Sequence, residues 1–142
     1  MNVEINKQAR LSQHFTLGGL CKTNAKTQDS NIPSRVHIEN LKRICGWLEM
    51  LRSEWNKRYG EGDDPIIINS GYRSEAVNKA VGGVKGSNHL TGCAVDIRVA
   101  GIEQLVRYAT ILLDIQFFAR LHFLTQIFAH SCNRCEASKE RI

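Results

Sequence analysis

A histidine and an aspartate near the middle of the chain, His89 and Asp96, are of the residue types that bind metal ions. His89 ends a loop, Asp96 lies in an alternating apolar run, and Gly92 between them permits a close approach. A carboxylate inside a strand must be solvated, paired or bound to a cation, because burying a lone charge costs several kcal/mol. Imidazole nitrogen and carboxylate oxygen are both ligands of zinc. This spacing permits a zinc site, although an ordinary surface pair is its more common origin.

Three stretches of sequence around this pair form a more specific pattern. The first reads Ser-x-His-x-x-Gly-x-Ala-x-Asp and consists of Ser87, His89, Gly92, Ala94 and Asp96. The second, upstream, consists of Ser70-Gly71-Tyr72-Arg73-Ser74, then Asn78 and Gly82-Gly83. The third, near the N-terminus, is Leu11-Ser12-Gln13-His14-Phe15-Thr16. In this order and spacing, they resemble the zinc D-Ala-D-Ala carboxypeptidase family, which includes phage endolysins and shares its fold with the hedgehog signalling domain. The likeness runs from about Leu11 to about Leu113.

The resemblance implies a catalytic zinc held by a histidine, an aspartate and a second histidine, with one position open for water. It assigns His89 and Asp96 to the first two places. It assigns Arg73 to a catalytic substrate clamp, where a guanidinium can form two hydrogen bonds with a peptide oxygen or a carboxylate. The alternative for Arg73 is a turn arginine paired with a nearby acid. Ser87 is expected to bond to substrate or to a zinc ligand. Tyr72 is a candidate to border the substrate, although packing is the better explanation of this residue.

The C-terminal segment departs from the family pattern. The family places its third ligand in a Trp-x-His strand, with a glutamate just before it as general base. No tryptophan follows Trp55, and the nearest imitation ends at His130. His130 is therefore the candidate third ligand, with His122 a weaker match, and no glutamate lies within the few residues before either histidine. For both histidines, an ordinary position on the surface of a helix, exposed or half-buried, is the better explanation. Residues 114–142 are read as a divergent part of one domain spanning residues 1–142.

These motifs lead to two functional hypotheses. The first is a zinc-dependent metallopeptidase, of carboxypeptidase or endolysin type, that hydrolyses stem peptides of peptidoglycan. The alternative is a catalytically impaired homologue that binds zinc or cell-wall peptide without efficient cleavage, since the expected general base is missing.

Hydrophobic periodicity indicates the elements that position the site. Apolar residues at helical spacing predict a long helix from Pro33 to Tyr59, and a second begins at Ile102. Short strands are predicted at Ile66–Ile68 and Cys93–Val99. The expected fold is α+β, a small antiparallel sheet packed against two long helices. The predicted core stripe of the first helix is Leu41, Ile44, Cys45, Leu48, Leu51 and Trp55. That of the second is Ile102, Leu105, Val106, Ala109, Leu112 and Leu113.

Composition excludes several other classes of protein. Hydrophobic residues make up 42% of the 142 residues and charged residues 23%, as in soluble domains, and no apolar run is long enough to span a bilayer. The N-terminus lacks a secretion signal, so we expect cytoplasmic synthesis and action at the bacterial wall only after release. The net charge of +5 is dispersed and accompanies no nucleic-acid-binding motif, so no nucleic-acid partner is expected. The five cysteines form no disulfide framework, and Cys132–Cys135 alone is a weak metal motif.

Overall fold

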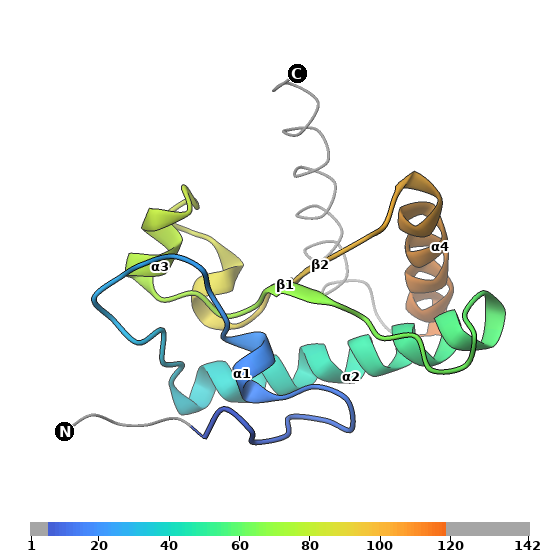
Figure 1. Ribbon diagram of the computed structural model, residues 1–142, viewed down its shortest axis with the longest axis horizontal. Coiled ribbons are helices and arrows are strands. Elements are labelled where there is room, and N and C mark those ends of the chain that lie inside the picture. The colour runs from blue at the N-terminus through green and yellow to red at the C-terminus, as the bar shows by residue number, and fades with distance from the viewer. Residues whose placement is uncertain (1–5, 119–142) are drawn as a thin grey trace.

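The computed structural model describes residues 6–118 and confirms the α+β class. Its elements are α1 (Leu17–Leu20), α2 (Arg35–Arg58), β1 (Ile68–Ser70), α3 (Glu75–Ala80), the 3₁₀ helix η1 (Asn88–Thr91), β2 (Asp96–Ile97) and α4 (Ile102–Phe118). Helix α2 runs along one side of the molecule, with the strands across it (Figure 1). α3 and η1 lie toward the N-terminal end of α2, and α4 stands near its C-terminal end. Within the described residues, no helix is both long and apolar enough to cross a membrane.

Helix α2 is the platform of the fold, and its start is fixed by a reciprocal cap. The Ser34 hydroxyl accepts from the backbone N–H of His37, and the His37 ring accepts from the backbone N–H of Ser34. The basic side chains of Lys57 and Arg58 occupy the last turn, where they complement the helix dipole. Its buried face is the predicted stripe, which the structure confirms: Leu41, Ile44, Cys45, Leu48, Leu51 and Trp55.

The core lies between this stripe and three other parts of the chain, which supply the strands, the N-terminal segment and α4. Burial of these apolar side chains provides the main stabilisation of the fold. Besides the α2 stripe, the cluster contains Phe15, Leu17, Leu20, Ile66, Ile68, Tyr72, Val95, Ile97, Tyr108, Ile111 and Leu112. Ile68 of β1 and Ile97 of β2 share this core with the α2 stripe, and this packing sets the distance between the strands and α2.

The two strands are antiparallel, and both differ from the prediction: β1 begins at Ile68, where the predicted Ile66–Ile68 strand ends, and β2 is shorter than predicted. Ile68 pairs with Ile97 and Ser70 pairs with Asp96, with an irregularity between the two pairs. The predicted strand at Cys93–Val99 is wrong in length, because β1 is only three residues long and offers few partners. Its predicted alternation is also wrong, since both Ala94 and Val95 are fully buried. The register nevertheless places Asp96 directly beside Ser70.

The predicted buried face of α4 is wrong at three of its six positions, whereas Leu112 is buried as predicted. Ile102, Val106 and Leu113 are exposed, whereas the helix buries Tyr108, Ile111 and Leu112. Two contacts with the end of α2 explain this orientation. The ring of Tyr108 meets that of Trp55 edge-on, with centroids 4.8 Å apart. Asp114 forms an ion pair with Arg58. These contacts rotate α4 away from the face that its apolar spacing favours.

Candidate metal centre

The structure brings His89 and Asp96 together in the interior. Their side chains are 0% and 5% exposed, and His89 Nε2 lies 3.6 Å from Asp96 Oδ1. This separation is longer than a hydrogen bond. Two ligands of a tetrahedral zinc, each about 2.0–2.2 Å from the metal, lie about 3.4 Å apart. The pair therefore has the donor atoms and the spacing that two zinc ligands require.

The backbone around His89 explains its inward position. Ser87 caps η1, and its hydroxyl accepts from the backbone N–H of His89 at 3.4 Å. Gly92 ends the turn at φ +73°, a left-handed conformation that favours glycine. A Cβ atom there would also lie 2.7 Å from the carbonyl oxygen of His37 in α2. The absence of a side chain at Gly92 thus allows η1 to pack closely against α2, with His89 buried in the interior.

The orientation of the His89 ring is set by a backbone carbonyl. Nδ1 of His89 lies 2.7 Å from the carbonyl oxygen of Gly71. A carbonyl oxygen can only accept, so Nδ1 carries the proton, and in the neutral ring the lone pair lies on Nε2. This is the usual arrangement of a zinc-binding histidine, whose other nitrogen donates to a carbonyl or carboxylate. A Cβ atom on Gly71 would lie 2.2 Å from the carbonyl oxygen of Leu20, so glycine is required for the close fit.

Asp96 is held by an arginine. Nη2 of Arg73 donates to Oδ2 of Asp96 at 2.8 Å, and Nε of Arg73 donates to the Ser70 hydroxyl at 2.9 Å. The backbone N–H of Arg73 donates to the carbonyl oxygen of His89 at 3.0 Å. Arg73 is 6% exposed. The structure therefore places Arg73 in an ion pair with a nearby acid, the alternative that the sequence left open, while its role as a substrate clamp stays a prediction.

Comparison with known proteins places the chain in a family of peptidases. The family model for peptidase M15 matches residues 13–130. The chain belongs to the peptidase M15 family. A 40-residue segment is 45% identical to a zinc D-Ala-D-Ala carboxypeptidase of Streptomyces albus G. That segment covers 28% of this chain and only 16% of the carboxypeptidase. No solved structure matches the chain. The resemblance proposed from the three sequence motifs is confirmed at the level of the family.

Two candidate protein ligands, His89 and Asp96, lie in the described part of this M15 chain. Between residues 6 and 118, no group of three or more histidine, cysteine, aspartate or glutamate residues is placed to hold a metal ion. The predicted third ligand, His130, and its weaker competitor His122 lie outside the described residues. The imidazole of His89 and the carboxylate of Asp96 fit zinc by chemistry and spacing. A catalytic zinc usually has three protein ligands, so a third must come from outside residues 6–118.

Tyr72 and Ser87, the other predicted site residues, both have structural contacts. The ring of Tyr72 stacks on that of His37, with centroids 5.0 Å apart, and burial raises the pKa of Tyr72 above its ordinary value. Ser87 is buried where it caps η1. Both border the candidate centre, Tyr72 beside Arg73 in the chain and Ser87 through the His89 backbone. Their predicted contacts with substrate stay predictions.

Asn31 is a positioning residue that sequence reasoning missed. Its Nδ2 donates to the carbonyl oxygens of Cys21 and Tyr72, at 2.8 and 3.2 Å, and its Oδ1 accepts from the backbone N–H of Ser74 at 2.7 Å. Asn31 is buried and adopts a positive φ of 48°. Asparagine tolerates that conformation better than most residues, so an asparagine in a turn before Pro33 was the available signal.

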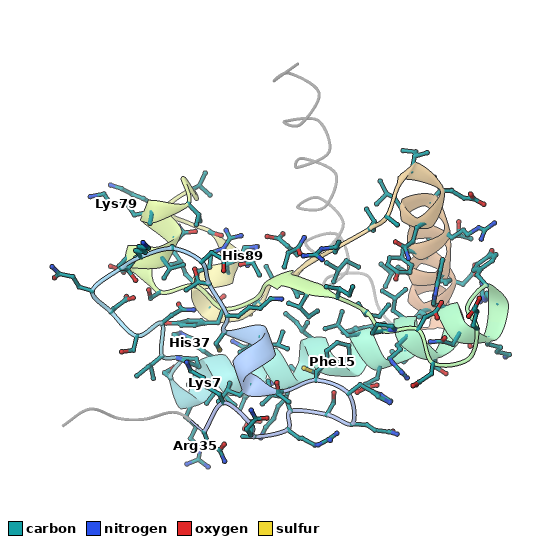
Figure 2. All side chains as sticks on the ribbon, in the orientation of Figure 1. Lys7, Phe15, Arg35, His37, Lys79 and His89 are labelled. Atoms are coloured by element: carbon teal, nitrogen blue, oxygen red, sulfur yellow. The ribbon has the colours of Figure 1, made fainter. Side chains whose placement is uncertain are left out.

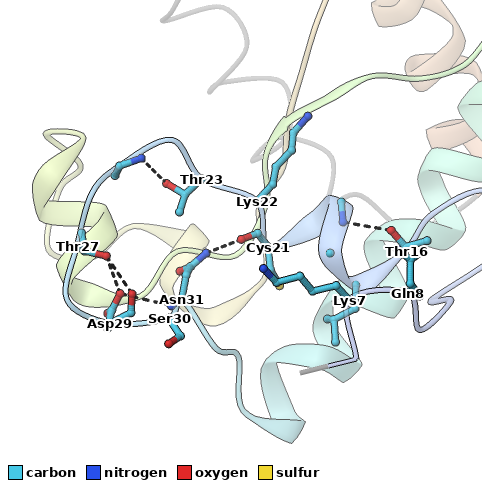
Figure 3. Close-up of a pocket in the computed structure, with 14 residues that line it drawn as sticks. Lys7, Gln8, Thr16, Cys21, Lys22, Thr23, Thr27, Asp29, Ser30 and Asn31 are labelled. Carbon is cyan, nitrogen blue, oxygen red and sulfur yellow. Dashed lines mark hydrogen bonds between the residues drawn. The ribbon is translucent and has the colours of Figure 1, made fainter. Parts of the chain in front are cut away.

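Asn31 also lines a pocket of about 450 Å³ in the N-terminal part of the chain (Figure 3). Asn31 lines this pocket together with Lys7, Lys22 and Asp29, and it also bonds to the backbone on both sides of Arg73. Arg73, His89 and Asp96 of the candidate centre do not line this pocket. Asn31 is therefore the structural link between the N-terminal loop and the M15 site.

Proposed function

We propose that this chain is a zinc-dependent peptidase, that His89 and Asp96 bind the metal, and that it hydrolyses D-alanine-containing stem peptides of peptidoglycan. The observation that carries the proposal is the buried pair of donor atoms, His89 Nε2 and Asp96 Oδ1, 3.6 Å apart in a member of the M15 family. The substrate class rests on the name of the Streptomyces albus G relative, over the short segment that matches it. Such a substrate would place the activity at the bacterial cell wall.

The residues of the chain would supply binding and orientation. Zinc, when bound, provides an acidified water and polarises the scissile carbonyl. The Gly71 carbonyl keeps the proton of His89 on Nδ1, and so directs Nε2 to the ligand position. Burial of His89 and Asp96 removes bulk water from around the ligands, which strengthens electrostatic interactions there.

A second candidate function is a homologue that binds zinc or cell-wall peptide without cleaving efficiently. The observation that favours it is the small number of ionisable groups at the centre. Within residues 6–118, no glutamate forms a cluster with His89 and Asp96, and the sequence has no glutamate in the few residues just before His130. A missing general base removes the group that would accept the proton of the attacking water.

Metal analysis tests the zinc site directly. The unchanged protein, dialysed after zinc loading, is compared with His89→Ala, Asp96→Asn and the double variant. Matched controls are His14→Ala, a histidine that pairs with Glu49 instead, and Asp63→Asn, an exposed aspartate. We expect stoichiometric zinc in the unchanged protein and the controls, and loss in the site variants, because fewer ligands hold zinc weakly. Stoichiometric zinc in the double variant would exclude the site.

A further inference from the structure

The two oxygens of the Asp96 carboxylate face different neighbours. Oδ2 accepts a hydrogen bond from Nη2 of Arg73 at 2.8 Å, whereas Oδ1 faces Nε2 of His89 at 3.6 Å. A carboxylate is planar, so holding one oxygen fixes the direction of the other. The partner of Oδ2 therefore determines whether Oδ1 points to the proposed metal position.

Arg73 is itself held on several sides. Its Nε donates to the Ser70 hydroxyl, and its backbone N–H donates to the carbonyl oxygen of His89. The strand register sets Ser70 directly opposite Asp96, so one planar guanidinium can reach both residues. Figure 2 shows His89, a residue of η1, above the N-terminal half of α2. The contacts thus join β1, β2 and η1 around one arginine.

We propose that Arg73 is a positioning residue that orients the Asp96 carboxylate toward the metal. The inference rests on the proposed function, because it takes His89 and Asp96 as zinc ligands. It differs from the substrate clamp implied by the family resemblance. The guanidinium is directed at Asp96 and Ser70, and the residue is 6% exposed, so its recorded bonds serve a ligand and not the surface of a cleft.

Arg73 has two opposing effects on zinc affinity. Its positive charge repels a divalent cation and draws electron density from the carboxylate, so its removal alone would raise the affinity. Its Nη2 holds the carboxylate in one orientation while Nε is fixed on Ser70, and loss of such an outer contact typically lowers metal affinity by about 10–100-fold. We expect orientation to dominate, because Asp96 already compensates the charge of Arg73 within the pair.

The test is a competition titration of zinc against a chromophoric chelator, with folding checked by circular dichroism. We expect Arg73→Gln to lower the zinc affinity by about 10–100-fold. We expect Arg73→Lys, which keeps the charge but not the planar fork, to lower it by about tenfold. Ser70→Ala should lower it by less than about tenfold, since only the second hydrogen bond of Arg73 is lost. Arg98→Gln removes an exposed arginine and should leave the affinity unchanged.

The outcomes separate this inference from the proposed function. Unchanged or higher zinc affinity in folded Arg73→Gln would overturn the positioning role and leave the zinc site intact. Folded variants that keep zinc but raise KM for a D-Ala-D-Ala peptide would establish the substrate clamp instead. Failure of the unchanged protein to bind zinc would overturn both proposals. If Arg73→Gln does not fold, Arg73→Lys and Ser70→Ala provide the test, because neither removes the positive charge that pairs with Asp96. Unchanged zinc affinity in both variants would overturn the inference.

Discussion

The carbonyl oxygen of Gly71 lies 2.7 Å from Nδ1 of His89, so a glycine with no side chain determines which nitrogen of the ring faces Asp96. The relationship depends on how closely Gly71 approaches the backbone of Leu20. The strand, the N-terminal helix and the candidate ligand are therefore coupled through one peptide unit.

Gly71→Ala should both destabilise the fold and weaken zinc binding. The added methyl group would lie 2.2 Å from the Leu20 carbonyl oxygen, so the backbone must shift, and overpacking of this kind costs about 1–3 kcal/mol. The matched control is Gly46→Ala on the exposed face of α2, where nothing lies within 4 Å of the new atom. That change should stabilise the protein by about 0.5–1 kcal/mol. Chemical denaturation measures both, and equal effects of the two substitutions would refute the close packing.

The free energy of unfolding should fall in acid through Glu49. Burial raises the pKa of Glu49, but hydrogen bonds from Ser12 and His14 outweigh it, and the net pKa lies below its ordinary value of 4.5. Because the folded pKa is the lower one, the stabilisation is fully present above about pH 4.5 and is lost as the pH falls below that value toward the folded pKa.

Denaturation curves of the unchanged protein and Glu49→Gln, measured between pH 3 and pH 7, test this dependence. We expect the stability difference between the two proteins to shrink as the pH falls through the window below 4.5. Glu61→Gln, which removes an exposed glutamate, serves as the control for net charge. A difference that stays constant over the whole range would show that Glu49 does not contribute in this way.

Turnover of peptides ending in D-Ala-D-Ala should be weak even with zinc bound. General-base catalysis typically contributes about 10²–10⁴-fold, and the sequence lacks the glutamate that would supply it. His130 could complete the ligand set, but the same side chain cannot also accept the proton of the attacking water. Steady-state assays with added zinc, run beside His89→Ala, measure the residual rate. Fast cleavage that disappears in His89→Ala would show that another acid acts as the base.

Local patterns predicted the parts of the fold that depend on local contacts. The α2 stripe was predicted correctly because a long helix with one apolar face has only one side to bury. Likewise local is the single turn of α1, where the Thr16 hydroxyl accepts from the backbone N–H of Gly19. The three motifs taken together, in their order and spacing, were sufficient to identify the family.

Features that depend on distant contacts were not predictable in this way. The orientation of α4 follows from Tyr108 meeting Trp55, two residues on different helices, and the apolar spacing of α4 alone favours another face. The limits of β2 follow from the short length of its partner. The choice between clamp and ion pair for Arg73 depends on which acid lies within reach, and only the strand register brings Asp96 there.

The buried side chain of Asn31 has a consequence for how sequences of this kind can change length. Its three hydrogen bonds tie Cys21 to Tyr72 and Ser74, which lie 41 and 43 positions after Asn31. Residues 22–30 are mostly exposed, and they join two ends that are already fixed. Insertions and deletions between those ends should therefore be accepted readily, whereas removal of the asparagine itself would release the turn that carries Arg73.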